Sequence, residues 1–181
     1  LADLQKAIQL DASGWRYQKL QAEYYIEHSQ PEKALAVATA FYQKHPDHLI
    51  MGMLYAKTLL LNKKYAETDK LLTGLQIIPF EGATDGRMLY REAKLMQAVA
   101  ALKQKKAGVA KKFIQQAALW PENLGVGKPY DADIDTRLED WMLYLTESKK
   151  EGAAAKSLLQ KIIRFTPATE NTINNFLPSN A

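Results

Sequence analysis

Apolar residues recur at helical spacing along most of the chain, in short stretches separated by Pro, Gly and charged turns. The best-defined stretch is PEKALAVATAFYQKHPD, residues 31–47. Pro31 suits the first turn of a helix and Pro46 cannot continue one, so the pattern predicts a helix from Pro31 to Pro46. Ala34, Ala38 and Phe41 form a stripe on it that is narrow at first and then bulky, which favours close approach of a neighbouring helix.

The same outline recurs at intervals marked by prolines that close helices. Pro46, Pro79, Pro121 and Pro167 are separated by 33, 42 and 46 residues. Self-similarity at periods of roughly 20–50 residues is typical of repeat proteins. The pattern therefore predicts helical repeats at 13–46, 47–82, 84–121 and 135–167.

Three further segments complete the predicted organisation. Residues 1–12 have the pattern of half a repeat, and residues 122–134 have the composition of an irregular loop. Residues 168–181 are expected to act as a cap or to begin another helix. Because a half repeat leaves an apolar face uncovered, we expect the natural protein to continue before Leu1. Ser13 is expected to cap the first helix of the first full repeat.

The repeat pattern resembles the tetratricopeptide repeat, a unit of about 34 residues with two helices. In residues 13–46 the small, aromatic and proline positions of that family match Ala22, Tyr25, Ala34 and Pro46, although Phe41 replaces a usual Ala. The resemblance implies that residues 1–181 form one all-α domain. It would be a right-handed α-solenoid of stacked antiparallel helix pairs.

A second resemblance concerns PENLGVGKPYD followed by RLEDW. These residues look like the C-terminal repeat region of large, uncharacterised bacterial proteins, which pair such repeats with a sugar-enzyme-like β domain. That β domain is not present in this sequence. The resemblance implies that the chain belongs to a larger protein.

Composition narrows the classes of function. The chain is 47% hydrophobic and 24% charged, which is ordinary for a globular domain. No run approaches the roughly 18 consecutive apolar residues of a membrane span, so none is expected. A net charge of +4 is far from the concentrated basic surface of nucleic-acid-binding proteins, and the absence of Cys excludes disulfides. Nothing in the sequence indicates a cellular compartment.

Three short motifs partly match known ligand-binding or metal-binding sequences. GVGKP lacks the Ser or Thr that follows the lysine of a phosphate-binding loop, because Pro129 stands there. Asp131, Asp133 and Asp135 alternate like calcium ligands, but Thr136 and Met142 occupy the positions that need Gly and Glu. His45 and His48 lack further zinc ligands at suitable spacing. We therefore expect no metal, no cofactor and no catalytic residue, and the chain is not expected to be an enzyme.

Lysines gather where first helices are expected to end. They are Lys63, Lys64, Lys103, Lys105, Lys106, Lys149 and Lys150. Two interpretations stay open: favourable contact with the helix dipole, and a basic ridge for an acidic partner.

The resemblance also implies which first-helix side chains face the concave groove. They are Arg16, Lys19, Glu23, Glu27, Met53, Lys57, Glu92, Arg137, Asp140 and Tyr144. The set carries both charges, and the Lys and Asn clamp that some family members use for a terminal carboxylate is not supported, since Glu23 lies one turn after Lys19.

These observations predict a non-catalytic scaffold for protein–protein interactions, with a protein or peptide ligand. The alternative is an accessory module of a carbohydrate-handling protein, which binds glycan or positions a neighbouring catalytic domain. Exposed aromatic rings in the groove would favour glycan, and charged or amide groups would favour peptide. Self-association through uncovered terminal helices is a third prediction.

Overall fold

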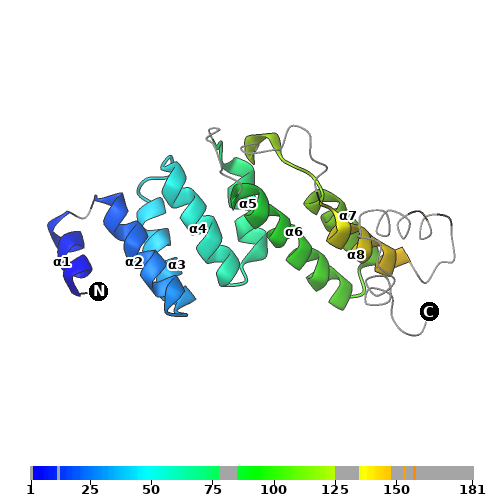
Figure 1. Ribbon diagram of the computed structural model, residues 1–181, viewed down its shortest axis with the longest axis horizontal. Helices are drawn as coiled ribbons and strands as arrows, with labels where there is room; N and C mark the ends of the chain where they lie inside the picture. The colour runs from blue at the N-terminus through cyan, green and yellow to red at the C-terminus, as the bar shows by residue number, and fades with distance from the viewer. Residues whose placement is uncertain are drawn as a thin grey trace, which may run out of the picture. The chain divides into compact units, whose positions relative to one another are not determined.

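The regular structure of the protein is helical wherever it is described. The computed structural model describes residues 2–11, 13–77, 85–124 and 135–147, with Ala153 and Ser157 singly. These residues contain no strand and form α1 (Ala2–Leu10), α2 (Trp15–Glu27), α3 (Pro31–Tyr42), α4 (Leu49–Leu61), α5 (Tyr65–Gly74), α6 (Asp85–Lys103), α7 (Ala107–Ala117), the 3-10 helix η1 (Glu122–Leu124) and α8 (Arg137–Glu147) (Figure 1). The expected all-α class is confirmed for this part of the chain.

Some of the sequence predictions lie outside the described residues. They concern most of the loop at 122–134, from residue 125 onwards, the expected second helix of repeat 135–167, and the segment 168–181. Lys149 and Lys150 of the predicted basic ridge also lie there.

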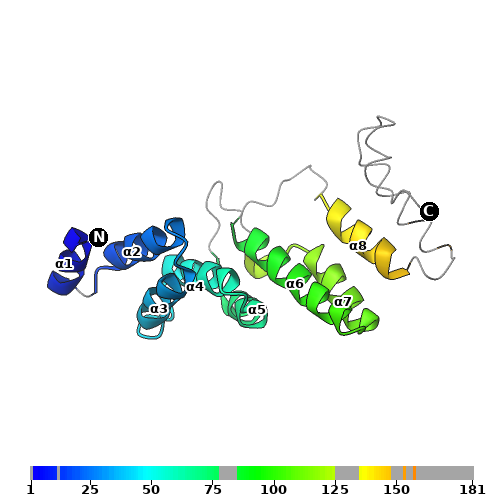
Figure 2. The same cartoon turned by 90° about the horizontal axis from the view of Figure 1, so that it is seen from below.

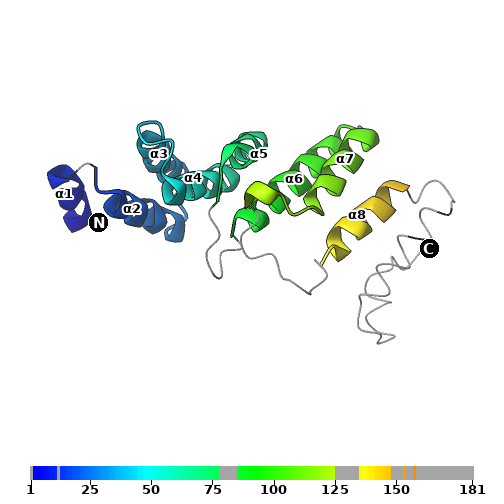
Figure 3. The ribbon, with the colours of Figure 1, turned by 90° about the horizontal axis from the view of Figure 1, so that it is seen from above.

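The chain divides into two compact units. The first is Leu1–Gln97 with Trp120–Lys128, and the second is Ala98–Leu119 with Pro129–Ala181. In the first unit, α1 packs against α2, α2 against α3, α3 against α4, and α4 against α5 (Figure 2). Helix α2 also contacts α4. In the second unit, α7 packs against α8 (Figure 3).

The turns that follow α2, α4 and α6 share one backbone conformation. Each contains a non-glycine residue in the left-handed region, with φ of 55° at Ser29, 60° at Lys63 and 59° at Lys105. After α2, the Ser29 N–H donates to the Ile26 carbonyl and the Gln30 N–H donates to the Tyr25 carbonyl. This pair of bonds defines the Schellman motif, which satisfies carbonyls at the end of a helix.

The same two bonds recur after α4 and after α6. After α4, the Lys63 N–H donates to the Leu60 carbonyl and the Lys64 N–H donates to the Leu59 carbonyl. After α6, the N–H groups of Lys105 and Lys106 donate to helix carbonyls in the same way. In all three places the next helix begins two residues after the left-handed residue. The helix pairs α2–α3, α4–α5 and α6–α7 are therefore joined by the same short turn.

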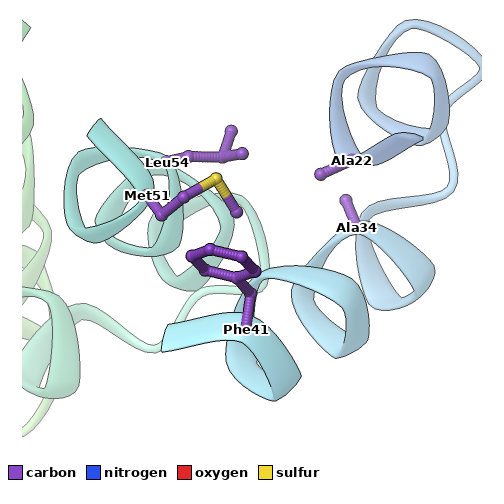
Figure 4. Packing of buried hydrophobic residues seen from close by; sticks show 5 residues of the cluster. All are labelled: Ala22, Ala34, Phe41, Met51 and Leu54. Atoms are coloured by element: carbon purple, nitrogen blue, oxygen red, sulfur yellow. The ribbon is translucent and has the colours of Figure 1, made fainter. Parts of the chain in front are cut away.

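The core between α2, α3 and α4 is narrow at one end and wide at the other. Ala22 of α2 and Ala34 of α3 are fully buried and face each other, whereas Phe41 packs with Met51 and Leu54 of α4 (Figure 4). The alanines let the two helices approach closely, because their side chains end at Cβ. The expectation that Ala34 and Phe41 lie on a buried stripe is confirmed.

A second core joins α4, α5, α6 and η1. Its buried members are Ala56, Leu72, Leu75, Tyr90 and Leu124. The side-chain amide of Asn123 donates to the carbonyls of Leu72 and Leu75, at 2.8 and 2.7 Å, and the Ile77 N–H donates to the Asn123 carbonyl at 2.9 Å. The segment after α7 therefore returns to the first unit and caps the end of α5.

A buried ion pair also connects α5 to α6. Lys94 Nζ lies 2.7 Å from Asp69 Oδ2, and the Gln97 side-chain amide donates to the same oxygen at 3.2 Å. Both charged side chains are largely buried, at 10% and 15% exposure. Such a pair adds little net stability by itself, because the cost of burying two charges largely offsets their attraction.

The second unit has a smaller core of its own. Ala98 and Ala101 of α6 pack with Ala110 and Ile114 of α7, and Met142 of α8 lies against this cluster.

Two sequence predictions about helix ends are wrong. The helix that starts at Pro31 ends at Tyr42, before Pro46, because the residue preceding a proline disfavours helical torsions and the last turn tightens. Ser13 does not cap α2: its hydroxyl donates to Asp11 Oδ1, at 2.7 Å, and Gly14 occupies the N-cap position without a side-chain hydrogen bond.

Candidate functional site

A cleft of about 470 Å³ opens between α2, α4 and the first half of α6, within the first unit. These three helices are the first helices of successive predicted repeats. The described residues that line the cleft are Lys19, Glu23, Leu49, Ile50, Met53, Leu54, Lys57, Ile77, Gly86, Met88, Leu89, Glu92 and Leu124. The volume is within the usual range of ligand sites, roughly 300–1,000 Å³.

The lining of the cleft is apolar and closely packed around Gly86. A Cβ atom at this position would lie 2.7 Å from Cδ1 of Ile77, 3.5 Å from Cε of Met53 and 3.6 Å from Cδ2 of Leu124. The first contact is shorter than real Cβ contacts, so a side chain at residue 86 would require the end of the Ile77 side chain to shift.

The sides of the cleft carry adaptable apolar groups. Met53 of α4 and Met88 of α6 both line it, and Met88 and Ile50 are 63% and 45% exposed. Methionine has an unbranched, flexible side chain and adapts to apolar partners of different shape. An exposed apolar lining of this kind favours contact with another molecule over internal packing.

The charged groups of the cleft fall into two classes. Lys19 and Glu23 lie one turn apart on α2 and pair with each other. Lys57 of α4 and Glu92 of α6 are exposed and form no ion pair with any residue in the described ranges. The cleft therefore presents one cation and one anion that no described residue neutralises.

These two charges have equivalent places on their helices. Lys57 lies four residues after Met53, and Glu92 lies four residues after Met88. Residues four apart share one face of a helix, one turn from each other. A ligand that covers both methionines therefore meets a hydrogen-bond donor on one helix and an acceptor on the other.

The cleft contains five of the ten residues that the sequence assigns to a binding face: Lys19, Glu23, Met53, Lys57 and Glu92. Arg16 and Glu27 are exposed on α2 and are not among the lining residues. The Arg16 guanidinium lies over the ring of Trp15, 4.6 Å from its centroid.

The other three residues lie on α8, in the second unit. Arg137 binds Asp135 through Nε and Nη2, at 2.8 and 2.7 Å, and these hydrogen bonds raise the pKa of Arg137 above its usual value. Asp140 is buried, with 7% exposure, and accepts a hydrogen bond from the Thr136 hydroxyl. The Tyr144 ring stacks on Trp141, with centroids 5.6 Å apart. These three side chains are engaged locally and are not part of the cleft.

The sequence prediction missed most of the apolar lining. Met88 was open to prediction, because it lies one turn before Glu92 on the same helix face. Ile77 and Leu124 were not, because they come from segments that interrupt the repeat pattern and reach the cleft only through the fold.

The polar side chains among the described lining residues are two lysines and two glutamates. None of the described lining residues is aromatic, and none is a histidine, serine or threonine that could act as base or nucleophile. Within the described residues, no group of three or more His, Asp or Glu side chains is placed to hold a metal ion. None of the described helices is long and apolar enough to cross a membrane.

No protein-family model and no curated protein matches this sequence. The likeness to tetratricopeptide repeats therefore rests on the residues and the repeated pattern alone.

Proposed function

We propose that this chain is a non-catalytic scaffold that binds a peptide segment of a partner protein in the cleft between α2, α4 and α6. The observation that carries the proposal is the composition of that cleft. It combines an exposed apolar surface at Ile50 and Met88 with two unneutralised charges of opposite sign, Lys57 and Glu92. Peptides offer both apolar side chains and charged groups, which such a surface complements.

The proposal extends to the architecture. The helix pairs α2–α3, α4–α5 and α6–α7 would stack as a right-handed solenoid of the tetratricopeptide kind. Two findings support this arrangement: the three pairs share the same Schellman turn, and three first helices contribute to one cleft. Concave surfaces formed by successive repeats are the usual binding surfaces of solenoids.

Peptide is preferred to glycan as the ligand. Exposed aromatic rings in the cleft would favour glycan binding, and the described lining residues include none. They include two lysines and two glutamates instead.

Selection from a random peptide library on the immobilised chain tests this function. Ile50→Glu places a charge on the apolar side of the cleft at a residue that is 45% exposed. Leu61→Glu makes the same change on the same helix, at a residue that is 43% exposed and outside the lining. Because the exposures match, both variants should fold equally well.

We expect selected peptides to lose affinity for Ile50→Glu by about tenfold or more, the equivalent of about 1.4 kcal/mol, and to bind Leu61→Glu as they bind the wild type. Fluorescence anisotropy with labelled peptides measures both. Equal binding to the wild type and to Ile50→Glu would exclude the cleft as the peptide site.

A further inference from the structure

We propose that the cleft selects a peptide in which an apolar side chain is flanked by one acidic and one basic side chain, the acidic one at Lys57 and the basic one at Glu92. This inference rests on the proposed function and specifies its ligand. It follows from which charges of the cleft are already neutralised and which are not.

The pair on α2 contributes little to selection. Lys19 and Glu23 bind each other, so a ligand must break that contact to use either charge. Lys57 and Glu92 lie on different helices, and neither has an ion-pair partner among the described residues. They are therefore the charges that an incoming ligand meets first.

The opposite signs of these two charges disfavour a ligand whose charges are all of one sign. An acidic peptide would gain contact with Lys57 and place like charge at Glu92, and a basic peptide would do the reverse. Like charges brought together across an interface weaken binding and suppress wrong partners. A peptide that carries both signs gains at each position.

The apolar side chain of the ligand is expected to contact Met53 and Met88. Met53 and Met88 lie one turn before Lys57 and Glu92 on the two helices, and both line the cleft. Flexible thioether side chains accept Leu, Ile, Met or Phe without demanding one shape. The selectivity of the cleft is therefore expected to come from charge order more than from the identity of the apolar residue.

The probe is a set of blocked eight-residue peptides with the same central leucine. Its flanking positions carry Glu and Lys in either order, two Glu, two Lys, or two Gln. Because exposed ion pairs are individually weak, we expect the better mixed-charge peptide to bind about fivefold more tightly than either like-charged peptide. Isothermal titration calorimetry at low salt measures these affinities with the full 181-residue chain.

Reversal of each charge provides the sharper test. Lys57→Glu makes residues 57 and 92 both acidic, so the preference should move to the peptide with two Lys. Glu92→Lys should move it to the peptide with two Glu. Lys70→Glu, at an exposed residue of α5 outside the lining, changes the net charge equally and should leave the preference unchanged.

The possible results separate this inference from the proposed function. If peptide binding is weakened by Ile50→Glu but does not depend on the charges of the peptide, the inference is overturned and peptide binding in the cleft still holds. The same conclusion follows if library-selected peptides bind in the cleft while the whole designed set does not. Binding that is insensitive to Ile50→Glu would overturn the proposed function itself.

Discussion

Ala22 of α2 and Ala34 of α3 point toward each other, and neither has any surface exposed to solvent (Figure 4). The two helices meet at this point with only methyl groups between them. The helix pair thus depends on small residues at a place that carries no charge or hydrogen bond.

Enlarging one of these methyl groups should force the helices apart. We expect Ala34→Leu to lower the free energy of unfolding by about 1–3 kcal/mol through overpacking. Ala36→Leu provides the matched control, because Ala36 is exposed on the same helix. Thermal and urea unfolding followed by circular dichroism measure the difference. An unchanged midpoint for Ala34→Leu would contradict the close crossing of α2 and α3.

Removing one partner of the ion pair between Asp69 and Lys94 should clearly lower the free energy of unfolding. Asp69→Asn removes the carboxylate charge beside a largely buried ammonium, and we expect a loss of about 2–4 kcal/mol. Glu67→Gln on the same helix affects an exposed pair with Lys64 and should cost less than about 1 kcal/mol.

The double variant Asp69→Asn with Lys94→Met tests whether the two side chains stabilise the protein through their interaction or independently of each other. If the two groups stabilise α5 against α6 together, the double variant should lose clearly less than the sum of the single losses. Additive losses in urea titrations would show that the two side chains act separately.

The left-handed residue after α4 offers a stabilising substitution. Lys63 has φ of 60°, a conformation that costs an L-residue free energy and costs glycine none. We expect Lys63→Gly to raise the free energy of unfolding by about 0.5–1 kcal/mol. At the neighbouring Lys64, φ is −87°, so Lys64→Gly should give no gain. A gain at both positions, or at neither, would argue against strain at residue 63.

The stability of the first unit should depend on alkaline pH through Tyr90. Burial raises the pKa of Tyr90 above its ordinary value of 10.0, the nearby Asp69 raises it further, and Arg87 partly offsets this. The folded state therefore favours the neutral phenol. That contribution is complete below pH 10.0 and is lost as the pH rises through the folded-state pKa.

We expect Tyr90→Phe to flatten the fall in stability above pH 10.0. Urea unfolding at a series of pH values between 9 and 11 measures the slope for the wild type and the variant. Burial raises the pKa of Tyr42 as well, so the variant with Phe at both positions should be flatter still. Identical slopes for the wild type and Tyr90→Phe would contradict the assignment.

Much of the helical framework follows from the sequence. Pro31 does begin α3, and Ala34 and Phe41 are buried as their helical spacing indicates. These features depend on interactions within one or two turns, where residue type and spacing largely decide the outcome. The predicted concave positions came instead from the resemblance to tetratricopeptide repeats, and five of the ten line the cleft.

The exact helix ends could not be obtained in this way. Ser13 is a good capping residue by type, yet its hydroxyl donates a hydrogen bond to Asp11, and Gly14 occupies the N-cap position. Several arrangements of a turn satisfy the same polar groups, and small differences in local geometry decide among them.

The sequence by itself determined the helical character of the residues that the structure describes, the pairing of short helices and the mixed charge of the surface they offer. Only the tertiary structure decided that Ile77 and Leu124 meet Gly86 at the base of a cleft, and that Asn123 caps α5. These contacts join residues from separate segments of the chain. Helical periodicity describes the face of a single helix and carries no information on which distant segment will cover it.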